Sequence, residues 1–198
     1  MRPSHRAAIS AALAMVVAGG GVLAWAAVAQ EDAAAQGAST VFTRIATVLQ
    51  SPRCLNCHTV TDFPRQGDDR HAHIFLVSRG VDDRGWPYAR CTSCHGDANN
   101  DATGIPGRPD WHLAPVSMGW EGLSPGQLCH RLLDPAANGH RSPQQIADHI
   151  ARDRQFVAWA WSPGRNLAGV ERSVPPIPHD EFAGLVQQWV AAGAPCPQ

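Results

Sequence analysis

The pentapeptide C-x-x-C-H occurs twice in this chain, as Cys-Leu-Asn-Cys-His at 54–58 and as Cys-Thr-Ser-Cys-His at 91–95. Two thiols three positions apart can reach the two vinyl groups of one porphyrin and form thioethers, and the His that follows can then bind the iron. The motif is typical of covalent c-type haem attachment, and its repetition predicts two haems. The predicted attachment sites are Cys54, Cys57, Cys91 and Cys94, and the predicted proximal iron ligands are His58 and His95.

Cysteine pairs at this spacing also bind zinc or act as redox dithiols. Two C-x-x-C pairs whose first cysteines lie 37 positions apart (91 minus 54) could supply the four thiolates of a zinc ribbon. That site does not require a His after each pair, yet both pairs have one. A thioredoxin-like dithiol would lie next to a βαβ pattern, and neither motif does. We therefore expect haem attachment over these two alternatives.

The composition leaves little material for an ordinary hydrophobic core. Gly and Pro account for 34 of the 198 residues (18 plus 16), and two long polar segments, 59–90 and 96–123, show no helical or strand periodicity. Such long loops are uncommon in a compact domain unless they enclose something. A large cofactor can supply the buried area that a small hydrophobic core lacks. The predicted fold class is mainly α with extensive irregular loops, in a cytochrome c-like dihaem protein.

Four segments have helical signals. They begin near Thr40, after Ser124, after Ser142 and near Asp180. Apolar residues recur at helical spacing in the first and the last of them. The two middle ones start with Ser-Pro-x-Gln, which combines a capping Ser, a Pro at the first helical position and a Gln three residues after the cap. We expect the first helix to stop at Pro52 and the last to end near Ala192.

Residues 1–29 have the pattern of an export signal. Two arginines precede an almost unbroken run of Ala, Val, Leu and Gly, which ends in small residues at 27–29 that signal peptidase accepts. The alternative is an uncleaved membrane anchor, because the run is long enough to span a bilayer. A Gly triplet at 19–21 interrupts the run and favours cleavage. Residues 30–198 are then expected in the periplasm as a single dihaem domain, with a C-terminal helical part at 124–198.

The charge distribution excludes nucleic-acid binding. All sixteen basic residues are Arg, and without the two in the predicted signal, fourteen (16 minus 2) remain against seventeen Asp and Glu. A nucleic-acid-binding surface needs a basic face. We therefore expect no nucleic-acid partner, and a membrane contact only if the N-terminal segment is uncleaved.

Two cysteines, Cys129 and Cys196, lie outside the haem motifs. Cys129 falls inside the helix that starts after Ser124, and Cys196 lies just past the last helix. In an oxidising compartment such a remaining pair indicates a disulfide, which would pin the last helix to the rest of the domain. Two separate buried thiols are the alternative.

Each iron also needs a distal ligand or leaves that side open. His71 and His73 lie between the haem motifs and are the first candidates, Met118 in its Pro/Gly-rich loop is the second, and His112 is the third. A Met ligand would raise the reduction potential relative to two His ligands. The other exported histidines are expected at the surface or as helix caps: His130, His140, His149 and His179. Six tryptophans are expected as haem-pocket walls and core: Trp86, Trp111, Trp120, Trp159, Trp161 and Trp189.

The order of several short segments resembles a known family. CLNCH, QGDDRHAH, RCTSCHGDAN, PGRPDWHLAP, SMGWEG, NGHRS and a final CP are similar to small periplasmic dihaem cytochromes c, which are often labelled isoquinoline 1-oxidoreductase subunits. The resemblance runs from about Cys54 to Cys196. It implies a redox partner, a molybdenum hydroxylase of the xanthine dehydrogenase type. The chain has no molybdopterin or iron–sulfur motif, so it would not perform the hydroxylation itself.

Electron transfer by a periplasmic dihaem cytochrome is therefore the expected function. Two other classes share the haem motifs. A dihaem peroxidase would keep one haem five-coordinate and reduce peroxide, although such enzymes are usually much longer. A haem-based sensor would bind a small gas at an open iron.

Overall fold

The computed structural model describes residues 36–37, 39–153 and 155–198, so the predicted signal at 1–29 lies outside the described residues. The chain divides after Gly37 into two units, and the second, Ala38–Gln198, contains both C-x-x-C-H motifs. Among the described residues, no helix combines the length and the apolar character needed to cross a bilayer.

Helices provide most of the regular structure. A helix over 39–49 precedes five others: α2 (Pro52–Leu55), α3 (Pro125–Leu133), α4 (Pro135–Asn138), α5 (Pro143–Arg152) and α6 (His179–Ala191). Three short 3-10 helices are η1 (Cys91–Ser93), η2 (Val116–Met118) and η3 (Ala158–Trp161). The described strands form two antiparallel two-residue pairs, β1 (Arg65–Gln66) with β2 (His71–Ala72) and β3 (Gly85–Trp86) with β4 (Ala89–Arg90). The predicted mainly α class with irregular loops is confirmed.

The helices begin where the local chemistry predicts. In α3, the Ser124 side chain accepts a hydrogen bond from the Gln127 N–H, and the Gln127 side chain accepts one from the Ser124 N–H. The same reciprocal cap opens α5, with Ser142 and Gln145. Pro52 follows the end of the first helix, as expected, and also opens α2, because its fixed φ suits a first helical position. This immediate restart brings the first C-x-x-C-H motif onto a helical turn.

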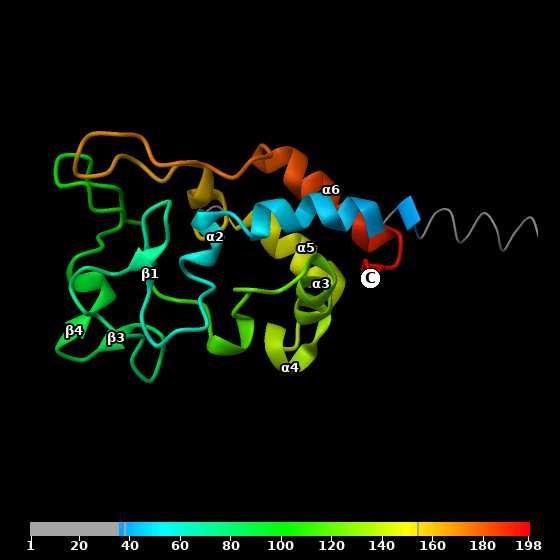
Figure 1. Cartoon of the computed structure of the whole chain (residues 1–198), viewed down its shortest axis with the longest axis horizontal. Helices are drawn as coiled ribbons and strands as arrows, with labels where there is room; N and C mark the ends of the chain where they lie inside the picture. Colours follow the sequence, from blue (N-terminus) through cyan, green and yellow to red (C-terminus); the bar gives the residue numbers. More distant parts are fainter. Residues whose placement is uncertain (1–35, 38, 154) are drawn as a thin grey trace, which may run out of the picture. The chain divides into compact units, whose positions relative to one another are not determined.

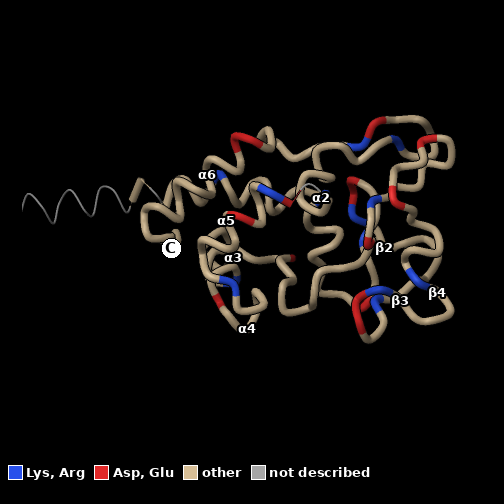
Figure 2. Tube along the Cα trace, turned by 180° about the vertical axis from the view of Figure 1, so that it is seen from behind, with Lys and Arg blue, Asp and Glu red and all other residues tan. Residues whose placement is uncertain are grey.

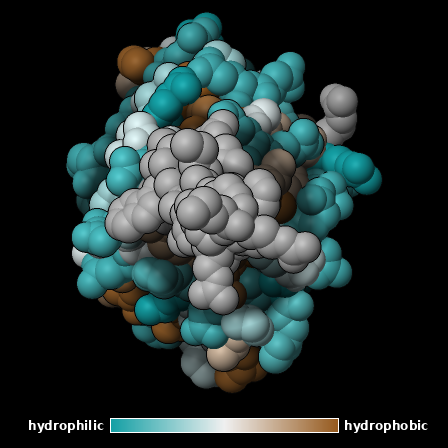
Figure 3. Space-filling view, turned by 90° about the vertical axis from the view of Figure 1, so that its right-hand side faces the viewer, coloured by the Kyte–Doolittle hydropathy of each residue, from teal (hydrophilic) through white to brown (hydrophobic). Residues whose placement is uncertain are grey.

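A single apolar cluster joins the longer helices. It includes Phe42 and Ile45 from the helix over 39–49, Leu128 from α3, Ile150 from α5 and Trp189 from α6. In Figure 1 these helices lie together near the C-terminus, with the helix over 39–49 beside α6. The Phe42 and Trp189 rings pack 4.9 Å apart. Figure 3 looks at this end and shows a mostly hydrophilic surface where the described residues are visible, with only separate hydrophobic spots. The apolar faces of the helices therefore point inward.

The predicted disulfide is present. Cys129 in α3 is bonded to Cys196 beyond α6, with an S–S distance of 2.06 Å. Next to it, the Trp189 indole N–H donates to the Pro195 carbonyl at 2.9 Å. The disulfide holds the C-terminal segment against α3, and the hydrogen bond holds it against α6.

Arginine side chains hold the loops together. Arg79 is only 6 % exposed, and it donates to the carbonyls of Ala114, Thr59 and Thr61 and forms an ion pair with Asp83. Other arginine–carboxylate pairs span the same region, between Arg53 and Asp68, Arg70 and Glu121, Arg84 and Asp110, and Arg90 and Asp82. Figure 2 shows basic and acidic residues next to one another around β2, β3 and β4. These side-chain contacts connect the loops in the way that backbone hydrogen bonds connect the strands of a larger sheet.

Candidate functional site

The first C-x-x-C-H motif occupies the end of α2. The Cys57 N–H donates to the Cys54 carbonyl at 3.2 Å, and the His58 N–H donates to the same carbonyl at 2.9 Å. This turn gathers the two thiols and the imidazole, and all three side chains line one cavity. Neither cysteine is in a disulfide. The motif thus presents two free thiols and one imidazole together.

The imidazole of His58 is held in one orientation and one tautomer. Its Nδ1 lies 2.8 Å from the Met118 carbonyl oxygen. Because a carbonyl can only accept, Nδ1 carries the proton and Nε2 keeps its lone pair. The Trp120 indole stacks on the ring, with centroids 3.4 Å apart and planes 7° from parallel. Burial lowers the pKa of His58 to about 4, so the ring is neutral and its Nε2 is available to a metal.

The second motif repeats this arrangement. It begins with η1, where the His95 N–H donates to the Cys91 carbonyl at 3.0 Å. Nδ1 of His95 lies 2.6 Å from the Pro106 carbonyl oxygen, and Trp111 stacks on the ring at 4.4 Å with planes 2° apart. Burial lowers the pKa of His95 as well. Both motif histidines therefore have a protonated Nδ1 on a carbonyl, a free Nε2 and a Trp against one face.

A glycine follows each of the two carbonyl residues. After Pro106, a Cβ on Gly107 would lie 2.2 Å from the Ala98 carbonyl oxygen. After Met118, a Cβ on Gly119 would lie 2.6 Å from the Val60 side chain. Only glycine permits these close approaches, which bring each carbonyl to its imidazole. The dipeptides Pro-Gly and Met-Gly, each followed by a Trp within a few residues, are the sequence signal of the carbonyl and the Trp that contact each motif histidine.

A cavity of about 450 Å³ opens beside the first motif. Cys54, Cys57 and His58 form one wall, and α5 and η3 contribute much of the rest. Two arginines on the wall, Arg53 and Arg108, are each only 6 % exposed. Burial raises the pKa of Cys54 to about 11, so this thiol is protonated at neutral pH. The cavity is thus largely apolar, with thiols at one side and buried positive charge on its wall.

The structure separates the predicted distal candidates. The His73 ring centroid lies 6.1 Å from that of His95, with planes at 69°. His71 is two residues away but turns to Asp69, whose Oδ1 lies 2.6 Å from its Nδ1. Met118 and His112 both line the cavity of the first motif. Of His71 and His73, only His73 therefore lies close to a motif histidine.

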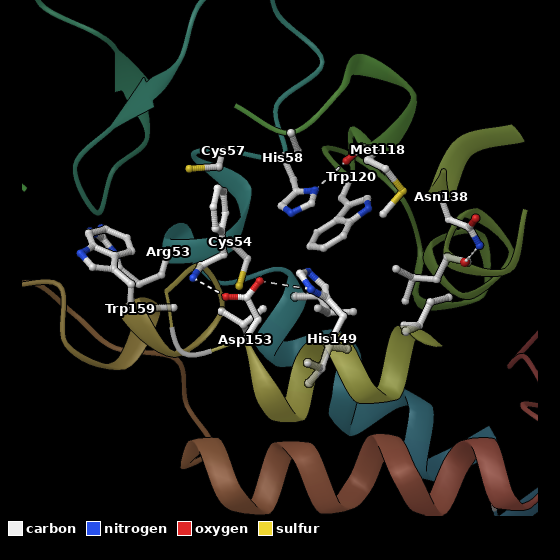
Figure 4. A pocket seen from close by; sticks show the side chains of 18 of the residues that line it. Arg53, Cys54, Cys57, His58, Met118, Trp120, Asn138, His149, Asp153 and Trp159 are labelled. Atoms are coloured by element: carbon white, nitrogen blue, oxygen red, sulfur yellow. Dashed lines mark hydrogen bonds and ion pairs between the residues drawn. The ribbon is translucent and has the colours of Figure 1, made fainter. Parts of the chain in front are cut away.

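One cavity residue was missed by the sequence reasoning. His149 was expected at the surface or as a helix cap, yet it lines the cavity, and Figure 4 shows its ring directed from α5 into that space. The available signal was its spacing, because His149 shares a helix face with the buried Ile146 and Ile150. Trp86, expected as core or haem-pocket wall, does not lie in the core, since it is 41 % exposed and stacks on Tyr88.

Within 36–37, 39–153 and 155–198, no three or more His, Cys, Asp or Glu side chains form a group that could hold a bare metal ion. Comparisons of the chain with known protein families, with curated proteins and with solved structures gave no match.

Proposed function

We propose that the chain is a periplasmic dihaem c-type cytochrome that transfers electrons. The observation that carries this proposal is the repeated arrangement at the two motifs. Each places two free thiols beside an imidazole whose Nδ1 is bound to a carbonyl and whose Nε2 is free. This is the arrangement that a thioether-linked haem with a proximal His requires.

The surroundings of the first motif suit a haem in size and in charge. A cavity of about 450 Å³ is within the range of cofactor pockets. Cys54 and Cys57 would hold the porphyrin edge and His58 the iron, while Arg108 offers positive charge to the propionates, because Arg53 is already paired with Asp68. The haem supplies an iron that gains and loses one electron. The chain's own residues orient the imidazole and exclude water from it.

The second motif suits a six-coordinate haem. Cys91 and Cys94 would hold this haem, with His95 as its proximal ligand. Two imidazoles on opposite sides of one metal have centroids about 6 Å apart, since each metal–nitrogen bond is about 2 Å and each ring adds about 1 Å. The His73–His95 separation of 6.1 Å agrees with this value. His73 is thus the proposed distal ligand of the second haem. An iron with both axial positions filled favours electron transfer over peroxide or gas binding.

The proposed electron donor comes from the resemblance to the dihaem cytochrome family. A molybdenum hydroxylase would pass electrons from its substrate to this chain. The test is haem reduction upon mixing with such an enzyme and its substrate. If the haems stayed oxidised, this donor would be ruled out, and the cytochrome assignment would be unaffected.

The experiment that tests the cytochrome assignment is intact mass spectrometry of the exported protein together with a pyridine haemochrome spectrum. We expect two haem-sized mass additions in the wild type. A Cys91→Ala/Cys94→Ala variant should retain one, and the matched control Cys129→Ala/Cys196→Ala should retain both. A colourless protein with no added mass would overturn the proposal.

A further inference from the structure

The distal side of the first haem site can be assigned from the residues that face His58 across the cavity. Besides the motif's own cysteines and His58, three cavity-lining side chains carry a nitrogen or sulfur that can bind iron: Met118, His112 and His149. The choice among them follows from how each is held.

Met118 is held on the proximal side. Its own carbonyl accepts the Nδ1 proton of His58, so its backbone lies behind the proximal imidazole. Its side chain packs against the apolar cluster. Figure 4 shows the Met118 sulfur beside Trp120 and turned away from Cys54 and Cys57. A porphyrin tethered by these cysteines would not have this sulfur opposite His58.

His112 is held by contacts with Asp110 and Phe156. Its Nδ1 lies 2.6 Å from the Asp110 carbonyl oxygen, and its ring packs on Phe156 with centroids 4.6 Å apart. Asp110 and Phe156 therefore already engage one ring nitrogen and one face of His112.

His149 is held toward His58. It lies in the last turn of α5, whose Ile146, Ile150 and following Asp153 line the same cavity. Its side chain is 43 % exposed, and Figure 4 shows that it points into the cavity below His58 and Trp120. The two imidazoles therefore face one another across the space beside the cysteine pair.

Asp153 orients the His149 ring. Its Oδ2 lies 3.3 Å from Nδ1 of His149, one helical turn away. Its Oδ1 accepts the backbone N–H groups of Gln155 at 3.1 Å and Phe156 at 2.7 Å, which hold the carboxylate in place. A carboxylate on one ring nitrogen directs the other toward a metal and raises its basicity. Asp153 and His149 together have this arrangement, with Nε2 left for the cavity.

We propose that His149, oriented by Asp153, is the distal axial ligand of the haem attached at Cys54 and Cys57. This inference rests on the proposed function. It makes the first haem a bis-His centre whose reduction potential lies below that of a His/Met centre. The carboxylate lowers the potential further, because negative charge near the iron favours the ferric state.

The test uses the haem-loaded, full-length protein and ferric electron paramagnetic resonance. His149→Ala should convert one of the two haems from low-spin to high-spin, and added imidazole should restore the low-spin signal. The matched control is His130→Ala, which removes an exposed helical histidine in α3 and should leave both haems low-spin. Two low-spin haems in His149→Ala, without added imidazole, would overturn the assignment.

Two further readouts keep the test independent of folding and of haem loading. Asp153→Asn should leave both haems low-spin but raise the midpoint potential of one of them, and an unchanged potential would argue against the orienting role of Asp153. The wild type should lack the near-infrared band of a thioether bound to ferric iron, and that band would assign Met118 instead. The mass of each variant reports haem attachment, so failure of the proposed function is seen separately as missing haem.

Discussion

Removal of the Cys129–Cys196 disulfide should destabilise the protein by an amount that follows from the loop it closes. The two cysteines are 67 positions apart, and for that separation the chain-entropy treatment predicts a loss of about 4.4 kcal/mol at 25 °C. For a unit of this size, each kcal/mol lowers Tm by about 2–4 °C, so a decrease of about 9–18 °C is expected. Stability is lost because the unfolded chain gains conformational entropy when the disulfide is absent.

The assay is urea unfolding of haem-loaded protein followed by circular dichroism, with the iron reduced in every sample. The perturbation is Cys129→Ala/Cys196→Ser. Because Cys129 is fully buried, its substitution also removes packed sulfur, and the reduced wild type is the matched control that keeps both sulfur atoms. Thioethers to haem survive the reductant, whereas the disulfide does not. If reducing the disulfide of the wild type lowered the free energy of unfolding by less than about 1 kcal/mol, the view that this link restrains the unfolded chain would be refuted.

Three other predictions concern the two proposed haem sites. His73→Ala should make one haem high-spin, whereas His71→Ala should not, because only the His73 ring lies 6.1 Å from His95; unchanged ferric resonance spectra in His73→Ala would contradict this. Trp120→Ala should cost about 3–5 kcal/mol in unfolding free energy, since the ring is only 5 % exposed, and a cost near zero would contradict its packing role. Arg108→Leu should lower the potential of the first haem, because buried positive charge favours the ferrous state; a rise in redox titration would count against it.

Local signals in the sequence predicted most of the helices. The caps at Ser124 and Ser142 involve atoms within four residues of one another, so the pattern Ser-Pro-x-Gln is sufficient to place them. The last helix was expected over 180–192 and is observed at His179–Ala191. The short α4 was not expected, because it is a single turn after Pro135 with little periodicity to detect.

The partners of the motif histidines could not be predicted in the same way. The Met118 carbonyl comes to His58 from 60 positions away, and Trp120 from 62. These contacts depend on loops closed by buried arginines such as Arg79, and loop paths have no periodic signature. Sequence reasoning named Met118 for its sulfur, whereas the contact that the structure contains is through its carbonyl.

The sequence alone determined the local chemistry of this protein: two thiol–thiol–imidazole turns and the capped helices. Each of these depends on neighbours in the chain, whereas the structure decided that Cys129 and Cys196 are bonded rather than separate thiols. The tertiary structure decided which side chains face each imidazole, turning His71 outward, bringing His73 to His95 and directing His149 into the cavity. The physical reason is that a helix or loop residue acquires its environment from packing against distant segments, and no short-range pattern contains that information.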